Sequence, residues 1–187
     1  MKCALFLAEG FEECEALIVV DLFRRTGVMI DTVSITSQKM VLSSHQIGIQ
    51  ADKILDEIKF DEYDVLILPG GKLGTQNLEK CSPLMSAYKN HLLSGKLTCA
   101  ICAAPSILGH LGLLKGKRFT CFPGFEENGF SGTYENELTV QDDNLITGRG
   151  MGATIAFALL ILKNIVDEET IKKVQHGIQY EHTFRQI

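Results

Sequence analysis

Hydrophobic and polar positions follow two different periods along this chain. Short apolar or alternating runs, typical of buried strands, occupy residues 3–8, 29–35, 65–68 and 97–101. Longer stretches with helical spacing follow, at about 12–26, 82–94, 103–111, 153–166 and 168–175. Strands that alternate with helices predict a doubly wound, mostly parallel sheet, in a single domain that covers residues 1–187.

Smaller patterns complete the predicted architecture. Residues 40–50 predict a hairpin or two short edge strands, residues 118–122 another strand, and residues 138–147 a hairpin turning at Asp142-Asp143-Asn144. In the first helix, the apolar residues of 16–20 together with Leu22 and Phe23 nearly encircle the axis. We therefore expect this helix to be buried on more than one side, in the core or at a subunit interface.

Binding sites in doubly wound sheets lie beyond the carboxyl ends of the strands, which selects the loops at 9–15, 69–75 and 102–104. The third loop predicts a nucleophile elbow, because the apolar run 97–101 ends abruptly at Cys102 and small residues then open a helix. Pro105 suits the first turn of that helix. Unpaired N–H groups under the thiol predict a lowered pKa for Cys102. The alternative is that Cys102 is a small buried hydrophobic residue.

Glu15 has both a structural and a chemical explanation. Acidic residues are favoured in the first turn of a helix by the macrodipole, and this accounts for Glu12, Glu13 and Glu15 alike. Helical periodicity, however, directs Glu15 away from Glu13 and toward the apolar Val19. A carboxyl group buried beside a thiolate would have a raised pKa, stay protonated and shuttle protons.

Other motifs carry less weight. Gly70-Gly71 after a strand indicates a tight turn, close backbone approach to a carbonyl oxygen, or both. Cys99 and Cys102 have dithiol spacing, but Cys99 falls inside the predicted strand. The glycines at 148, 150 and 152 have the wrong spacing for a dinucleotide fingerprint. No His/Cys cluster has zinc-ligand spacing, so the sequence implies neither a metal nor a cofactor.

Composition narrows the function classes. The formal net charge of -5 and the pI of about 5.5 argue against nucleic-acid and acidic membrane surfaces as partners. No targeting segment is visible, and the apolar run 153–162 is far shorter than a membrane span. We therefore expect a cytoplasmic protein whose six cysteines are reduced. His45, His91 and His110 are interpreted as loop or helix-surface residues.

Four motifs in register, at residues 8–15, 68–74, 100–105 and 148–152, together resemble the DJ/ThiJ/PfpI superfamily. The similarity is greatest to the Parkinson's-linked protein deglycase branch and its bacterial ThiJ-type relatives. The resemblance implies a flavodoxin-like three-layer α/β/α sandwich with a mostly parallel central sheet, as in class I glutamine amidotransferases. It also implies a reactive cysteine at Cys102, a protonated acid at Glu15, and backbone N–H donors at Gly71 and Ala103.

The same resemblance implies a cofactor-independent cysteine enzyme whose partner is a small reactive carbonyl or a glycated adduct. Such an enzyme converts methylglyoxal to lactate, or removes early glycation adducts from proteins or nucleotides. The alternative is a non-enzymatic redox sensor or a stress-protective, chaperone-like protein. The residues do not separate these hypotheses, because both need an exposed thiolate beside an acid.

Departures from the superfamily pattern matter too. The peptidase-like branch has histidine directly after its cysteine, where this chain has Ala103, and some deglycase members have histidine at the place of Phe122. Base chemistry therefore falls to Glu15, and a cysteine peptidase is a distant third hypothesis. We expect a homodimer through the first helix. Arg25 resembles a position near that contact, although it is equally an ordinary surface charge.

Overall fold

The computed structural model describes residues 1–180 and is built around a seven-stranded sheet, so the last seven residues of the predicted domain lie outside the described part. The strand order is β10-β11-β7-β6-β1-β2-β5, and every neighbouring pair is parallel except the antiparallel β10–β11 hairpin. This arrangement confirms the doubly wound, mostly parallel sheet. Its strands are β1 (Lys2–Leu7), β2 (Met29–Ser34), β5 (Lys53–Ile54), β6 (Val65–Leu68), β7 (Leu97–Ile101), β10 (Thr139–Asp142) and β11 (Leu145–Gly148).

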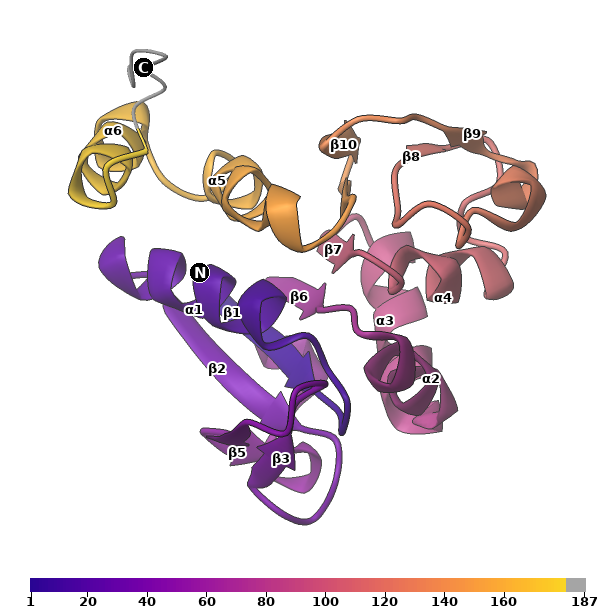
Figure 1. Ribbon diagram of the computed structural model, residues 1–187, viewed down its shortest axis with the longest axis horizontal. Helices are drawn as coiled ribbons and strands as arrows, with labels where there is room; N and C mark the ends of the chain where they lie inside the picture. Colours follow the sequence, from indigo (N-terminus) through magenta and orange to yellow (C-terminus); the bar gives the residue numbers. More distant parts are fainter. Residues whose placement is uncertain (181–187) are drawn as a thin grey trace.

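Helices cover both faces of the sheet (Figure 1). One face carries α1 (Glu13–Arg25), α5 (Thr154–Leu162) and α6 (Glu168–Gly177), and the other carries α2 (Lys72–Lys80), α3 (Ser82–Leu93) and α4 (Pro105–His110). Alternate side chains of β1 enter the two cores, since Leu5 packs with the first set and Phe6 with the second. The continuous apolar runs thus come from strands buried on both faces, and the flavodoxin-like three-layer sandwich is confirmed.

Within residues 1–180, two small sheets and four 3-10 helices lie outside the central sheet. β3 (Met40–Leu42) and β4 (Gly48–Gln50) form the expected hairpin, and β8 (Arg118–Phe119) pairs with β9 (Thr133–Tyr134). The predicted strand 118–122 is too long, because after Phe119 the Thr120 amide turns to bond the Thr147 hydroxyl at 2.9 Å. The 3-10 helices are Leu55–Glu57, Phe60–Glu62, Glu127–Ser131 and Met151–Ala153.

The helices differ from the pattern most clearly at α5, α3 and α2. The stretch expected to be helical over 153–166 begins as a 3-10 turn, and α5 ends at Leu162. α3 starts at Ser82 with Cys81 as its N-cap, one residue earlier than the Ser-Pro signal indicates. α2 was not predicted, because it buries only Gly74, Thr75 and Leu78. α2 can pack this close to the loop at 9–15 only because residue 74 is glycine, since a Cβ atom there would lie 2.6 Å from the Cα of Phe11.

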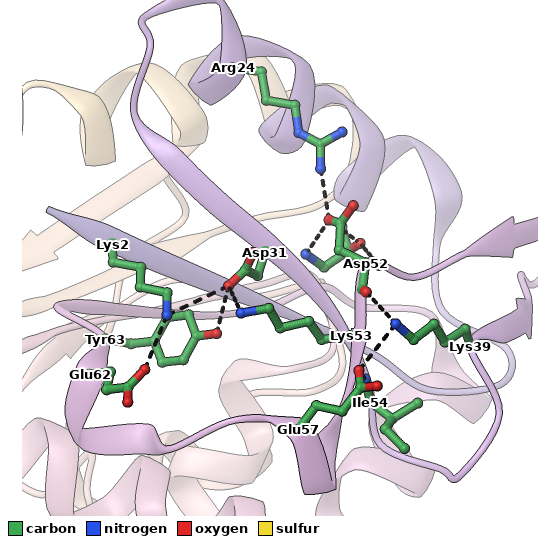
Figure 2. A network of polar contacts seen from close by, with 11 residues as sticks. Lys2, Arg24, Asp31, Lys39, Asp52, Lys53, Ile54, Glu57, Glu62 and Tyr63 are labelled. Atoms are coloured by element: carbon green, nitrogen blue, oxygen red, sulfur yellow. Dashed lines mark hydrogen bonds and ion pairs between the residues drawn. The ribbon is translucent and has the colours of Figure 1, made fainter.

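A polar network fixes the edge of the sheet at β2 and β5 (Figure 2). Asp52 accepts hydrogen bonds from the Thr32 amide (2.9 Å), the Thr32 hydroxyl (2.7 Å) and the Arg24 guanidinium (2.7 Å). Asp31 accepts a 2.6 Å bond from the Tyr63 hydroxyl, and Lys53 lies 3.0 Å from the same carboxylate. Side-chain bonds therefore anchor β5, which is only two residues long.

No helix within residues 1–180 combines the length and the apolar character that crossing a bilayer demands.

Candidate active site

The three loops selected from the sequence meet at the carboxyl edge of the sheet. The Glu12 amide donates to the Gly70 carbonyl at 3.0 Å, and the Gly74 amide donates to the Gly10 carbonyl at 3.1 Å. The Cys102 amide donates to the Gly148 carbonyl at 2.9 Å, which adds the end of β11 to the cluster. The three loops therefore lie together, as expected for strands that end at the same edge of a parallel sheet.

Cys102 lies in a sharp turn between β7 and α4, as the elbow pattern predicts. Its φ of 65° is in the left-handed region, which costs a non-glycine residue roughly 1–2 kcal/mol. Hydrogen bonds hold the turn on both sides, because the Cys102 carbonyl accepts from the Phe122 amide at 2.8 Å while its own amide bonds Gly148. Strain maintained in this way presents a side chain above the sheet edge, and Cys102 is only partly buried.

Glu15 lies beneath this thiol and is fully buried (0% exposed). Its Oε2 accepts a 2.8 Å hydrogen bond from the Gly70 amide, and the carboxyl group also hydrogen-bonds to Cys102. Within residues 1–180, Oε1 has no hydrogen-bond partner. Burial raises the pKa of Glu15 to about 7, against the lowering effect of the bonds from Cys102 and Gly70. The prediction of a buried carboxyl with a raised pKa beside the thiol is confirmed.

The thiol itself differs from expectation. Burial, and then the charge of Glu15, raise the pKa of Cys102 to about 12, although backbone hydrogen bonds from Gly71 and Ala103 lower it. The prediction of a lowered pKa is wrong, first because burial penalises the charged thiolate and then because the charge of Glu15 lies beside the sulfur. The helix expected to lower the pKa begins only at Pro105, three residues after Cys102.

Cys102 and Glu15 are therefore best treated as one unit. Burial and mutual repulsion raise the pKa of both groups, so the pair resists losing its second proton and carries a single negative charge once the first is lost. The amides of Gly71 and Ala103 stabilise that charge on the sulfur, and the Gly70 amide stabilises it on the carboxylate. Because the pKa of the thiol is raised above that of Glu15, the remaining proton resides mainly on the sulfur, and its transfer to Glu15 gives the reactive arrangement of a thiolate beside a neutral acid.

Gly70 and Gly71, which follow β6, leave room for the side chains of Cys102 and Glu15 to lie side by side. A Cβ atom on Gly70 would lie 2.5 Å from the Cβ of Cys102 and 2.7 Å from Oε2 of Glu15. Gly71 has a φ of 88°, and a Cβ there would overlap the carbonyl oxygen of Gly10. The tight turn is confirmed, and the backbone approaches Cys102 and Glu15 closely, whereas approach to a bound carbonyl oxygen stays a prediction. The direct bond from the Gly70 amide to Glu15 was not foreseen.

The remaining cysteine and histidine candidates have structural roles. Cys99 is fully buried inside β7, and this burial raises its pKa well above the usual value, which excludes an exposed dithiol pair. His91 is buried (5% exposed) with its Nε2 3.2 Å from the Asp64 carbonyl, so its surface assignment is wrong: α3 turns it toward the sheet. His45 and His110 are exposed, as expected.

Glu12, Glu13 and His45 form a group of potential metal ligands whose donor atoms lie within 4.8 Å of one another. Sequence spacing could not reveal it, because His45 comes from the β3–β4 hairpin. The group is already internally bonded: His45 Nδ1 lies 2.6 Å from Glu13, and the Ser44 hydroxyl donates to Glu12 at 3.0 Å and Glu13 at 3.1 Å. We therefore assign it no metal.

A cavity of about 280 Å³ adjoins the elbow and was not predicted from the sequence. The Phe122 ring forms one wall and packs against Gly150, where a Cβ atom would lie 3.3 Å from the ring. The glycines at 150 and 152 line the cavity, but in the sequence their spacing only argued against a dinucleotide fingerprint and indicated no cavity. The lining residues are Phe122, Pro123, Leu138, Arg149, Gly150, Met151, Gly152 and Ala153.

Comparison with known proteins identifies relatives along nearly the whole chain. The chain is 33% identical to Protein dj-1beta of Drosophila melanogaster, over 95% of this chain and 96% of the relative. It is 30% identical to Glutathione-independent glyoxalase DJR-1.2 of Caenorhabditis elegans, over 90% and 91% of the two chains. Protein DJ-1 homolog B of Arabidopsis thaliana is 34% identical over 92% of this chain, which spans only 40% of that longer protein.

Solved structures agree with this result. A cysteine-to-alanine mutant of a DJ-1 superfamily protein from Salmonella typhimurium superposes with a TM-score of 0.90 at 34% identity, covering 95% of this chain and 97% of the other. Toxoplasma gondii DJ-1 in a structure described as oxidized gives 0.90 at 28% identity, covering 96% and 98%. The DJ-1/PfpI family itself matches residues 1–164. With the elbow, the buried acid and the three-layer sandwich in place, this chain belongs to the DJ-1/PfpI family.

Proposed function

We propose that the protein is a cofactor-independent cysteine enzyme that acts on reactive carbonyls, converting methylglyoxal to lactate or removing early glycation adducts. The observation that carries the proposal is the buried Glu15, with a pKa raised to about 7, hydrogen-bonded to the Cys102 thiol at the elbow. One relative that is 30% identical is named a glutathione-independent glyoxalase, which supports the same chemistry.

The first step is addition of the thiolate to the aldehyde carbon. The sulfur–carbon bond forms as the carbonyl π bond opens, and the new alkoxide takes the proton held by Glu15 to give a hemithioacetal. The amides of Gly71 and Ala103, which hydrogen-bond to the sulfur, are placed to stabilise the charge that develops beside it. Because Glu15 is acid and acceptor in turn, a pKa near neutrality suits both roles.

The second step moves a proton between neighbouring carbons. Ionised Glu15 removes the proton from the former aldehyde carbon and returns one to the adjacent carbon, which converts the hemithioacetal into a thioester of lactate. Water then attacks the thioester, and the sulfur leaves as the thiolate. The balance is methylglyoxal plus water to lactate plus a proton, so no external oxidant or reductant is needed. For a glycation adduct, the amine or thiol that carried the carbonyl unit leaves when the Cys102 sulfur replaces it.

The test follows methylglyoxal loss and lactate formation by proton NMR, with the wild type, Cys102→Ser and Glu15→Gln. Both variants are expected to lose turnover. Cys14→Ser is a matched control, since Cys14 is a partly buried cysteine on α1, next to Glu15 in the chain. Lactate formation at the wild-type rate in either the Cys102 or the Glu15 variant contradicts the proposal.

A second candidate function is oxidation sensing at the same cysteine. The amides that hydrogen-bond to the Cys102 sulfur would also bind the oxygens of a sulfinate, and a relative at 28% identity has been described in an oxidized form. Intact mass after mild peroxide treatment tests this function. One or two oxygens localised to Cys102, in a protein without aldehyde turnover, would favour sensing over catalysis. Rapid turnover with slow oxidation would favour the enzyme.

We also propose that α1 forms a homodimer contact. Most of its apolar residues are buried within the subunit, but Leu17 is 37% exposed and Ile18 is only partly covered. Arg25 forms an i,i+4 ion pair with Asp21 at 2.7 Å, which accounts for it as a surface charge. Light scattering of the wild type and of Leu17→Glu tests the contact. A monomeric wild type at all concentrations contradicts it.

A further inference from the structure

Arg149 is a cation without a counter-charge in the cavity beside the elbow. Its side chain is partly buried and lines the cavity together with apolar residues, among them Phe122 and Met151. Within residues 1–180, no carboxylate lies within 4.0 Å of its guanidinium, and the cavity lining includes no acid. The other described arginines, Arg24, Arg25 and Arg118, all form ion pairs.

Both walls of the cavity are bonded to the Cys102 backbone. Arg149 directly follows Gly148, whose carbonyl accepts the hydrogen bond from the Cys102 amide. On the other side, the Phe122 amide donates to the Cys102 carbonyl. These two bonds place the cavity beside the elbow turn, because Phe122 and the residue before Arg149 are both bonded to Cys102.

The nearby acid does not neutralise Arg149. Both Glu126 and Arg149 act on the Tyr134 phenol, whose pKa is raised by burial, by Cys121 and, least, by Glu126, and is lowered by Arg149. The Glu126 carboxylate, however, accepts a 2.6 Å hydrogen bond from the Gly124 amide in its own loop. A guanidinium that has lost part of its hydration without gaining a partner is stabilised by a ligand anion.

We propose that this cavity is a substrate subsite that binds an apolar, aromatic body and pairs a carboxylate on that body with Arg149. A planar carboxylate matches the guanidinium fork. A phosphate dianion would need more donors than one arginine among apolar walls supplies. The inference rests on the proposed function for the chemistry at Cys102 and narrows its substrates. Within the reactive carbonyls the subsite favours α-oxoaldehydes, or adducts, whose substituent is aromatic and bears a carboxylate.

The test uses two thiol reagents that differ only in that carboxylate: iodoacetanilide and 4-(iodoacetamido)benzoate. Rates of Cys102 alkylation are measured by mass spectrometry of the peptide. In the wild type we expect the benzoate reagent to react about tenfold faster, as a charge-assisted bond of about 1.4 kcal/mol allows. Arg149→Gln should abolish this preference, and Arg149→Lys should retain part of it. Phe122→Ala should slow both reagents alike.

Lys115→Gln is the matched control, because it removes one exposed positive charge elsewhere on the surface and should leave the preference unchanged. A second measurement does not need a reactive thiol: ¹⁵N-labelled Cys102→Ser protein is titrated with benzoate and with benzamide. The subsite is supported if benzoate shifts the amide signals of Gly150 and Phe122, and if these shifts disappear when Arg149→Gln is added to the Cys102→Ser protein. Equal alkylation rates for the two reagents overturn the proposed subsite, and so do amide shifts that persist in the Arg149→Gln variant.

These readouts are independent of turnover. Carboxylate preference without turnover of methylglyoxal or of an aromatic α-oxoaldehyde that bears a carboxylate would refute the proposed enzyme and keep the binding subsite. Turnover without carboxylate preference would refute the subsite and keep the enzyme.

Discussion

Replacing Glu15 by glutamine is expected to stabilise the protein while it abolishes activity, and the effect should depend on pH. The carboxyl is 0% exposed, and its pKa rises from 4.5 to about 7 on folding. A folded-state pKa above the unfolded value means that the folded protein binds the proton more tightly. The penalty for ionising the buried acid is therefore absent below pH 4.5, grows between 4.5 and 7, and is complete above 7.

The magnitude follows from the shift. A difference of about 2.5 pH units corresponds to about 3 kcal/mol at pH 8, and at pH 5 less than about 1 kcal/mol has developed. Glutamine has the same shape, accepts the Gly70 hydrogen bond through its carbonyl and stays neutral. Glu15→Gln should thus raise the free energy of unfolding at pH 8 by about 3 kcal/mol and at pH 5 by much less.

The assay is urea unfolding of the wild type and Glu15→Gln at both pH values, monitored by far-UV circular dichroism. Glu13→Gln provides a control on the same helix. Burial raises the pKa of Glu13, but its hydrogen bonds, among them those with Ser43, His45 and Ser44, outweigh burial and lower the pKa. Loss of the Glu13 carboxylate should therefore destabilise the protein. If Glu15→Gln changes the free energy of unfolding equally at pH 5 and pH 8, ionised Glu15 does not carry the destabilising buried charge that we assign to it.

Three further predictions concern the site loop, one histidine and the sheet edge. Gly70→Ala should abolish activity and lower stability, because the new Cβ would lie 2.5 Å from the Cβ of Cys102. Lactate formation and a thermal melt measure the two effects, and a fully active variant contradicts the close packing of Gly70 against Cys102. Burial lowers the pKa of His110, but its bonds to Glu79 (2.6 Å) and Glu127 (3.1 Å) outweigh burial and raise it. Protonated His110 therefore stabilises the folded protein fully below about pH 6.5, and this contribution disappears as pH rises through the raised pKa. The free energy of unfolding of His110→Gln should lose this pH dependence. The same pH dependence in the variant and the wild type refutes the role of the two bonds. Asp52→Ala should cost about 2 kcal/mol in urea unfolding, since three donors lose their acceptor, whereas a loss below about 0.5 kcal/mol would show that the edge network is dispensable.

The sequence predicted the central sheet well, because strands buried on both faces leave an unmistakable apolar run. α2 escaped prediction for the opposite reason: its contacts depend on Gly74 and on few apolar side chains. Short elements at the edge, such as β5, are held by side chains from distant segments and have no local signal.

The candidate site was predictable in its members but not in its electrostatics. Parallel topology brings the ends of β1, β6 and β7 together, so Glu15, Gly71 and Cys102 could be expected to meet. The raised pKa of the thiol depends on burial and on the charge of Glu15, which become clear only in three dimensions. The cavity at Arg149 was hidden in the same way, since its walls come from separate loops.

The central claim is that Cys102 and Glu15 share one proton near neutral pH. The most direct measurement is the rate of Cys102 alkylation by iodoacetamide from pH 5 to pH 10, in the wild type and in Glu15→Gln. The account predicts that the wild-type rate rises with an inflection near pH 7, where the pair loses its first proton, and that the variant lacks this inflection. The same single inflection in both proteins, at the ordinary thiol pKa of about 8.5, would contradict it.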